Sequence, residues 1–214
     1  MSAVAHIDQY KQGAFFKDEF RGELSWNGYE HNVLLRNQGP NDQGIPQFVD
    51  MGRAVGADEM NDARGIAVFD YDNDGDLDIA INHNPGDNHR GEVGIPAVLL
   101  ENQLGQNQNW LAVNLQGVES NRDAIGAMVT LEAGGLKLLR QVSAGSGYAG
   151  QGSKRLYFGL AAQDKVERLS VRWPSGKQES WQNLNVNRLI SLVEGQIEAS
   201  DKPLHKESQQ GGAR

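Results

Sequence analysis

The 214-residue sequence contains no cysteine, which excludes disulfide frameworks, zinc–thiolate sites and cysteine nucleophiles but leaves the compartment open. Its apolar runs are short, and none approaches the roughly 20 consecutive apolar residues of a membrane-spanning helix. Basic residues are not in excess either, because the formal net charge is −8. We therefore expect neither a membrane span nor a nucleic-acid partner.

Motifs of secretion and catalysis are also scarce. Residues 1–6 contain no basic segment followed by an apolar core, so no signal peptide is visible. Nucleophile elbows, metalloprotease helices and P-loops are absent, and no acid–base constellation has a workable spacing. We predict that the protein is not an enzyme, although a glycosidase-type pair of carboxylates stays an open alternative.

Glycine, by contrast, is abundant, with 26 residues, and asparagine and glutamine are frequent between the apolar runs. This composition favours an all-β protein with many turns. The pattern of the apolar runs changes near residue 109, which divides the chain into an N-terminal and a C-terminal half.

The most informative stretch is the acidic segment 70–78. It carries an aspartate at every second position: Asp70, Asp72, Asp74, Asp76 and Asp78. These carboxylates repel one another unless a cation offsets the repulsion, and calcium takes six to eight oxygen ligands from flexible loops. Gly75 stands where a calcium loop turns sharply. We predict that Asp70, Asp72, Asp74 and Asp78 bind calcium by side chain and Asp76 by its backbone carbonyl; an acidic turn without metal is the alternative.

The flanks of this loop distinguish it from an EF-hand. Ile81 stands where an EF-hand has a bidentate glutamate. Segments 65–69 and 77–82 are short, apolar and without helical period, so they predict strand, loop, strand. The loop with these strands resembles an FG-GAP or VCBS repeat, the calcium-carrying blade unit of integrin-type β-propellers.

Further strands are predicted around the loop. They cover residues 31–37, ending in a turn at 37–41, then 47–51 and 97–102. These supply about one blade, whereas a closed propeller needs at least four. His83 and His89, with Asn82, Asn84 and Asp87, could form a second metal site, but solvated loop residues are the favoured interpretation.

The C-terminal half predicts a β-sandwich. Seven short strands recur every ten to fifteen residues, at 110–115, 127–132, 136–142, 155–158, 166–173, 179–184 and 188–193. Leu169, Val171 and Trp173 alternate with Ser170 and Arg172, which predicts one buried and one solvated face.

This half resembles the ASPIC/UnbV domain of cartilage-acidic-protein-like chains. The resemblance is carried by residues 120–127 (SNRDAIGA), 145–148 (GSGY), 158–160 (FGL) and 173–176 (WPSG). Two positions depart from the family pattern: Ala161 replaces a usual glycine and Tyr157 a frequent histidine. The resemblance implies a secreted or surface protein and no established reaction. The family places this domain after a full run of propeller repeats, of which only about one precedes it here.

Two further motifs have structural explanations. Residues 145–150 match G-x-G-x-x-G, but a strand rather than a helix is predicted to follow, so a tight turn between sandwich strands is favoured over a nucleotide site. Residues 121–123 (Asn-Arg-Asp) could hold a small ligand. Turn hydrogen bonds or an ion pair of Arg122 and Asp123 are the favoured interpretation.

These observations combine into one reading of the chain. It is an all-β protein with an aromatic-rich N-terminal segment (1–30), an FG-GAP/VCBS-like calcium-binding unit (31–105), an ASPIC/UnbV β-sandwich (109–195) and a polar C-terminal tail (196–214) whose composition predicts disorder. We expect a calcium-binding extracellular or cell-surface protein with a structural or adhesive role. Its partners would be calcium, copies of itself joined through sheet edges and terminal segments in a filament or other assembly, and carbohydrate or surface proteins. A monomer whose termini cap its own sheet edges is the alternative to assembly. The alternatives are a carbohydrate-binding module and a fragment of a larger hydrolase.

Overall fold

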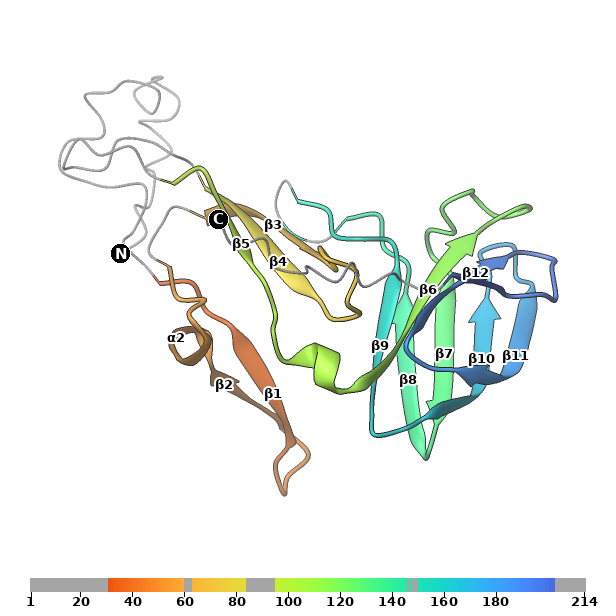
Figure 1. The fold of residues 1–214 in the computed structure, drawn as a ribbon, viewed down its shortest axis with the longest axis horizontal. Helices are drawn as coiled ribbons and strands as arrows, with labels where there is room; N and C mark the ends of the chain where they lie inside the picture. The colour runs from red at the N-terminus through yellow and green to blue at the C-terminus, as the bar shows by residue number, and fades with distance from the viewer. Residues whose placement is uncertain (1–30, 60–62, 84–94, 146, 148–149, 203–214) are drawn as a thin grey trace, which may run out of the picture. The chain divides into compact units, whose positions relative to one another are not determined.

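The computed structural model describes residues 31–59, 63–83, 95–145, 147 and 150–202 (Figure 1). The chain divides into two compact units, one of Met1–Gly65 and Ile81–Val98 and the other of Ile66–Ala80 and Leu99–Arg214. The predicted aromatic segment 1–30, residues 203–214 of the predicted tail and the candidate metal ligands Asn84, Asp87 and His89 lie outside the described residues. No helix in the described ranges is long and apolar enough to cross a membrane.

The C-terminal half folds as two four-stranded sheets, which confirms the predicted all-β sandwich (Figure 1). One sheet has the order β11-β10-β7-β8 and the other β13-β12-β6-β9. The strands are β6 (Asn109–Gln116), β7 (Met128–Ala133), β8 (Leu136–Gln141), β9 (Leu156–Ala161), β10 (Lys165–Arg172), β11 (Gln178–Asn185), β12 (Arg188–Val193) and β13 (Ser200–Lys202). β13 lies in the polar tail, where composition predicted disorder. It is held by antiparallel pairing with β12, while the indole of Trp181 donates a hydrogen bond to the Ile197 carbonyl.

The core lies between these two sheets. Leu111 of β6 and Phe158 of β9 join Leu131 of β7 and Leu169 of β10 in one cluster of fully buried side chains. The predicted alternation along β10 is confirmed, because Leu169 and Val171 are buried whereas the Arg172 side chain is exposed. Burying each such side chain stabilises the fold by about 1.5–3 kcal/mol.

The connection between β8 and β9 crosses from one sheet to the other, because β8 belongs to one sheet and β9 to the second. Ser146, Tyr148 and Ala149 of the predicted tight turn lie outside the described residues, so that turn stays a prediction. The backbone N–H of Ser153 in this crossover donates to the Val68 carbonyl, and a Cβ on Gly150 would lie 2.4 Å from the carbonyl oxygen of Ile66. Close packing thus explains Gly150, and strand β9 follows, where a nucleotide site would need a helix.

The N-terminal half contains two smaller sheets. Strands β3 (Ala63–Phe69), β4 (Asp78–His83) and β5 (Ala97–Leu100) form a three-stranded sheet of that order, which confirms the strand, loop and strand around the acidic segment. The short 3-10 helix η3 (Gly105–Asn107) precedes β6. These three strands remain fewer than the four of a propeller blade.

A separate hairpin consists of β1 (Leu35–Pro40) and β2 (Pro46–Asp50), followed by the short helix α2 (Gly52–Val55). The prediction that the first strand ends in a turn at 37–41 was wrong. The strand continues to Pro40 through an irregularity in register after Asn37, and the chain reverses after Asn41. The Asn41 carboxamide oxygen accepts the backbone N–H groups of Gln43 and Ile45, which fixes the turn there.

Candidate metal centre

The acidic loop connects β3 to β4 and is organised around the carboxylate of Asp70. Its Oδ1 accepts the backbone N–H of Asp74 at 3.1 Å, and its Oδ2 accepts that of Gly75 at 3.1 Å. Asn73 and Gly75 have φ values of 60° and 99°, in the left-handed region that asparagine and glycine adopt most readily. These two residues turn the chain so that the loop closes over the Asp70 side chain.

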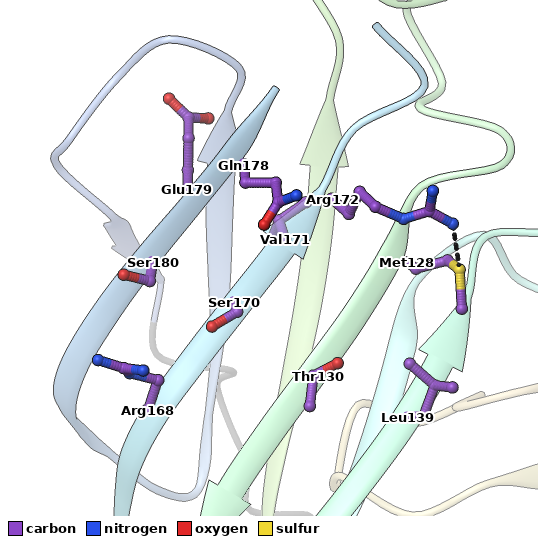
Figure 2. Close-up of a pocket in the computed structure, with 10 residues that line it drawn as sticks. All are labelled: Met128, Thr130, Leu139, Arg168, Ser170, Val171, Arg172, Gln178, Glu179 and Ser180. Carbon is purple, nitrogen blue, oxygen red and sulfur yellow. Dashed lines mark hydrogen bonds between the residues drawn. The ribbon is translucent and has the colours of Figure 1, made fainter. Parts of the chain in front are cut away.

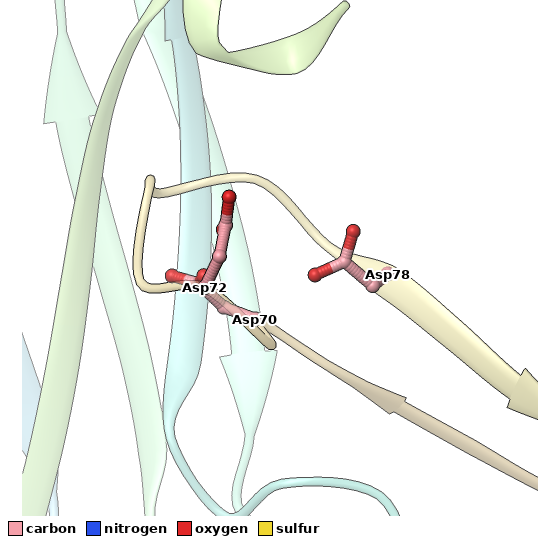
Figure 3. Close-up of side chains that lie close together, drawn as sticks. All are labelled: Asp70, Asp72 and Asp78. Carbon is pink, nitrogen blue, oxygen red and sulfur yellow. The ribbon is translucent and has the colours of Figure 1, made fainter. Parts of the chain in front are cut away.

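Three of the five predicted ligands converge. One carboxylate oxygen from each of Asp70, Asp72 and Asp78 lies within 4.8 Å of the other two (Figure 3). Asp78 is 1% exposed; its Oδ2 accepts the Tyr71 N–H at 2.7 Å and its Oδ1 the Asn102 N–H at 2.8 Å. These bonds fix the Asp78 carboxylate in place at the start of β4.

The other two aspartates do not join this group. The Asp74 Oδ1 accepts the backbone N–H of Asp76 at 3.1 Å, within the loop. The Asp76 side chain is buried against η3, where a Cβ on Gly105 would lie only 2.4 Å from the Asp76 Cβ. The structure therefore gathers three of the four aspartates that were predicted to bind by side chain and leaves Asp74 outside their group. The Asp76 side chain also lies outside the group, but only its backbone carbonyl was predicted as a ligand.

The electrostatics of the loop favour a cation. Burial raises the pKa of Asp70, and the nearby Asp74 and Asp72 raise it further, against the opposing effect of hydrogen bonds from Tyr157 and Gly75. A cation among these oxygens would stabilise the ionised form and offset the repulsion. The donor set consists of carboxylates, the hard oxygen ligands that suit calcium.

The loop packs on the outer face of the sandwich sheet that contains β6, β9 and β12. Trp110, Ala112, Tyr157 and Leu189 form a small apolar cluster on this face. Gly75 lies so close to Trp110 that an added Cβ would be 1.8 Å from the indole Cε2. Tight contact with the sandwich thus fixes the tip of the loop.

Two polar side chains complete this contact: Arg155, directly before β9, and Tyr157, within β9. Arg155 Nη1 donates to Asn73 Oδ1 at 3.2 Å and to the Tyr157 hydroxyl at 2.8 Å. The Tyr157 hydroxyl is in turn hydrogen-bonded to the Asp70 side chain, and burial raises the pKa of Tyr157 to about 12. The hydroxyl therefore stays protonated at neutral pH and donates to a carboxylate of the candidate centre.

A further buried acid outside the acidic loop, Glu194, was not found by sequence reasoning. Its Oε2 accepts the backbone N–H groups of Val118, Glu119 and Ser120 at 2.8–2.9 Å, and its Oε1 accepts the hydroxyls of Ser120 and Ser175. Although burial alone would raise its pKa, the hydrogen bonds from these partners lower the pKa of Glu194 to about 2. Glu194 thus joins two of the motifs, 120–127 and 173–176, that appeared separate in the sequence.

The remaining candidates have structural roles. Asn121 closes the turn of its motif with hydrogen bonds to the backbone of Ile125, and Asp123 forms an ion pair with Lys154 instead of Arg122. The buried His83 ring has its Nδ1 3.0 Å from the Ile95 carbonyl and its Nε2 3.6 Å from a Glu59 carboxylate oxygen. Within the described residues, neither group joins the carboxylates of the acidic loop.

Comparison with known proteins finds a family match within the sandwich and a weaker similarity over a longer part of the chain. Residues 117–199 match the family model "ASPIC and UnbV". The chain is 28% identical over 160 residues to cartilage acidic protein 1 of Xenopus tropicalis, covering 74% of this chain and 23% of that protein. It is also 28% identical over 186 residues to cartilage acidic protein 1 of Homo sapiens, covering 82% of this chain and 27% of that protein.

The chain thus spans about a quarter of the length of the curated relatives that it matches. The family match includes the loop at Val118–Ser120, the Ser175 turn and Glu194. It therefore contains Glu194 together with all the residues that donate hydrogen bonds to its carboxylate. The predicted ASPIC/UnbV resemblance is confirmed for residues 117–199, in a chain that is similar to part of cartilage acidic protein 1.

Proposed function

We propose that this chain is part of a calcium-binding extracellular protein with a structural or adhesive role and no enzymatic activity. The observation that carries the proposal is the convergence of Asp70, Asp72 and Asp78 in a loop that begins like a calcium loop. The similarity to proteins named cartilage acidic protein supports the location outside the cell. As part of this proposal, the loop and its two flanking strands form an FG-GAP or VCBS repeat.

Calcium would stabilise the protein by rigidifying the connection between β3 and β4. The ion would be held by the three converging carboxylates, with Asp74 and the Asp76 carbonyl as the further predicted ligands. Because the loop also contacts Trp110 and Tyr157, a fixed loop would hold this contact with the sandwich. Calcium sites of extracellular modules have Kd values of about 10⁻⁴–10⁻³ M, and we expect a Kd in this range for this loop.

Calcium titration calorimetry of the metal-stripped chain tests the proposal. We expect a heat of binding, and at a calcium concentration 100 times Kd a stabilisation of about 2.7 kcal/mol, or a melting temperature higher by roughly 5–10 °C. Asp72→Asn should weaken binding by at least about tenfold, because it removes a charged ligand. The amide oxygen can still accept the Asp74 N–H that Asp72 accepts now. Asp164→Asn, at an exposed position between β9 and β10, is the charge-matched control. The absence of a heat of binding in the wild type would contradict the proposal.

We further propose that the protein self-associates, up to a filament, through the β1–β2 hairpin. Leu35 and Phe48 are each 57% exposed. They lie on the same face because Phe48 pairs with Asn37, two residues after Leu35. A hairpin that leaves large apolar side chains on one face is suited to packing against a second copy.

Sedimentation velocity of the full chain tests this association. The sedimentation coefficient should rise with protein concentration, and Leu35→Ser combined with Phe48→Ser should abolish the rise because it removes the shared apolar face. Val49→Ser, on the opposite face of the hairpin, is the control and should change little. A wild-type chain that stays monomeric at high concentration with calcium, without filaments by electron microscopy, would refute the proposal.

A further inference from the structure

A groove of about 440 Å³ lies on the solvent face of the β11-β10-β7-β8 sheet (Figure 2). Its floor is a row of three hydroxyl side chains from three adjacent strands. Ser170 of β10 pairs with Ser180 of β11 on one side and with Thr130 of β7 on the other. Small side chains in one transverse row leave a trough across the strands.

Two arginines flank this row. Arg168 and Arg172 stand two residues before and after Ser170, so they lie on the same face, with Cα atoms about 13 Å apart for a strand rise of about 3.3 Å per residue. Both are exposed. The wet face of β10 thus carries two positive charges, one on each side of the hydroxyl row.

Neither arginine has a carboxylate partner among the described residues. Arg172 Nη2 lies 2.9 Å from the Met128 sulfur, a weak acceptor (Figure 2). Glu132, the cross-strand neighbour of Arg168, is paired with Lys137 at 3.2 Å instead. In a chain of net charge −8, two guanidinium groups without a carboxylate are donors available to an external anion.

The groove favours a polyhydroxylated ligand over a peptide. An extended peptide gains affinity by main-chain hydrogen bonds at a sheet edge, but this groove lies on a face whose central strands β7 and β10 are already paired on both sides. Only side chains are offered here. The three hydroxyls can exchange hydrogen bonds with ligand hydroxyls, and Leu139, 52% exposed, adds an apolar surface for the C–H face of a sugar ring.

We propose that this groove binds an acidic polysaccharide that crosses the strands, with its sulfate or uronate groups on Arg168 and Arg172 and its hydroxyls on the row of Ser180, Ser170 and Thr130. The groove lies on a different sheet from the one that the acidic loop covers. The inference therefore stands whether or not the loop binds calcium, and it would supply the adhesive role with a partner.

Binding of the full chain to heparin and to polygalacturonate, with dextran as the neutral polymer, tests the inference in calcium and again in chelator. We expect both polyanions to bind and dextran not to bind. Arg168→Ala with Arg172→Ala should weaken polyanion binding by roughly a hundredfold, because two charge-assisted contacts are lost. Arg122→Ala with Lys165→Ala removes the same charge from exposed positions outside the groove and should change binding less than about threefold.

Thr130→Val separates recognition from simple charge attraction. It keeps the shape of the side chain and both arginines but removes one floor hydroxyl, and it should weaken binding by roughly three- to tenfold. The inference is overturned if neither polyanion binds, if the two double variants lose affinity equally, or if Thr130→Val has no effect. Equal binding of an acidic peptide such as polyglutamate would also overturn it.

Discussion

Glu194→Ala is expected to lower the free energy of unfolding by about 3–5 kcal/mol, because the carboxylate is buried and its removal leaves its hydrogen-bond donors without an acceptor. Three backbone N–H groups and two hydroxyls lose their acceptor in one substitution. For a folded unit of this size the melting temperature should fall by roughly 10–15 °C. Chemical denaturation and calorimetry measure both quantities.

Glu198→Ala is the matched control, because Glu198 is an exposed glutamate four residues further along the chain. It should change the free energy of unfolding by less than about 0.5 kcal/mol. Glu194→Gln serves as the conservative variant. Its carboxamide keeps one acceptor oxygen but presents an NH₂ group to the other donors, so it should destabilise nearly as much as alanine. If Glu194→Ala changed the free energy of unfolding as little as Glu198→Ala, the hydrogen bonds of Glu194 would not hold motifs 120–127 and 173–176 together.

The same carboxylate makes stability depend on pH. Its folded-state pKa is about 2, below its ordinary value of 4.5. The stabilisation by Glu194 is therefore fully present above about pH 4.5 and is lost as the pH falls from there towards 2. The difference in unfolding free energy between wild type and Glu194→Gln should be constant near neutral pH and shrink across this acidic window. A difference that grew on acidification would contradict the assignment.

Gly75→Ala is expected to destabilise the protein by about 3–5 kcal/mol. The added Cβ would lie 1.8 Å from Cε2 of Trp110, whose side chain is almost fully buried. A φ of 99° adds backbone strain of about 1–2 kcal/mol for a residue with a Cβ. Because the clash and the strain act together, the loop should detach from the sandwich or the indole should be displaced, and the fluorescence of Trp110 should report either change.

Gly135→Ala isolates the clash from the strain. Gly135 has a φ of 84° in the turn between β7 and β8, and a Cβ there would meet no atom within 4 Å. It should therefore cost only the strain. Combining Gly75→Ala with Trp110→Leu should recover part of the loss, because the smaller side chain makes room for the methyl group. Equal costs for Gly75→Ala and Gly135→Ala, with no recovery, would show that the loop does not pack on Trp110.

The regular parts of this protein follow from local sequence patterns. Alternation of apolar and polar residues along β10 predicted which side chains enter the core, and short β-rich runs predicted seven of the eight sandwich strands, all but β13. The acidic loop and its flanking strands were likewise located by residue spacing alone. Such patterns work because side chains of a strand alternate between two faces, so a local sequence reports burial.

The contacts that join these parts were decided by the tertiary structure. Glu194 and Ser120 are 74 residues apart, and nothing in the local sequence of either indicates the other. Likewise, no periodicity indicates that Trp110 packs on Gly75, or that Asp74 faces its own loop while Asp78 joins Asp70 and Asp72. Composition predicted disorder from residue 196 onward, but an edge of β12 was available and Ser200–Lys202 pairs with it. The sequence alone determined strands, loop and donor chemistry; only the fold brought distant residues within hydrogen-bonding distance, because that depends on how the sheets pack and not on neighbours along the chain.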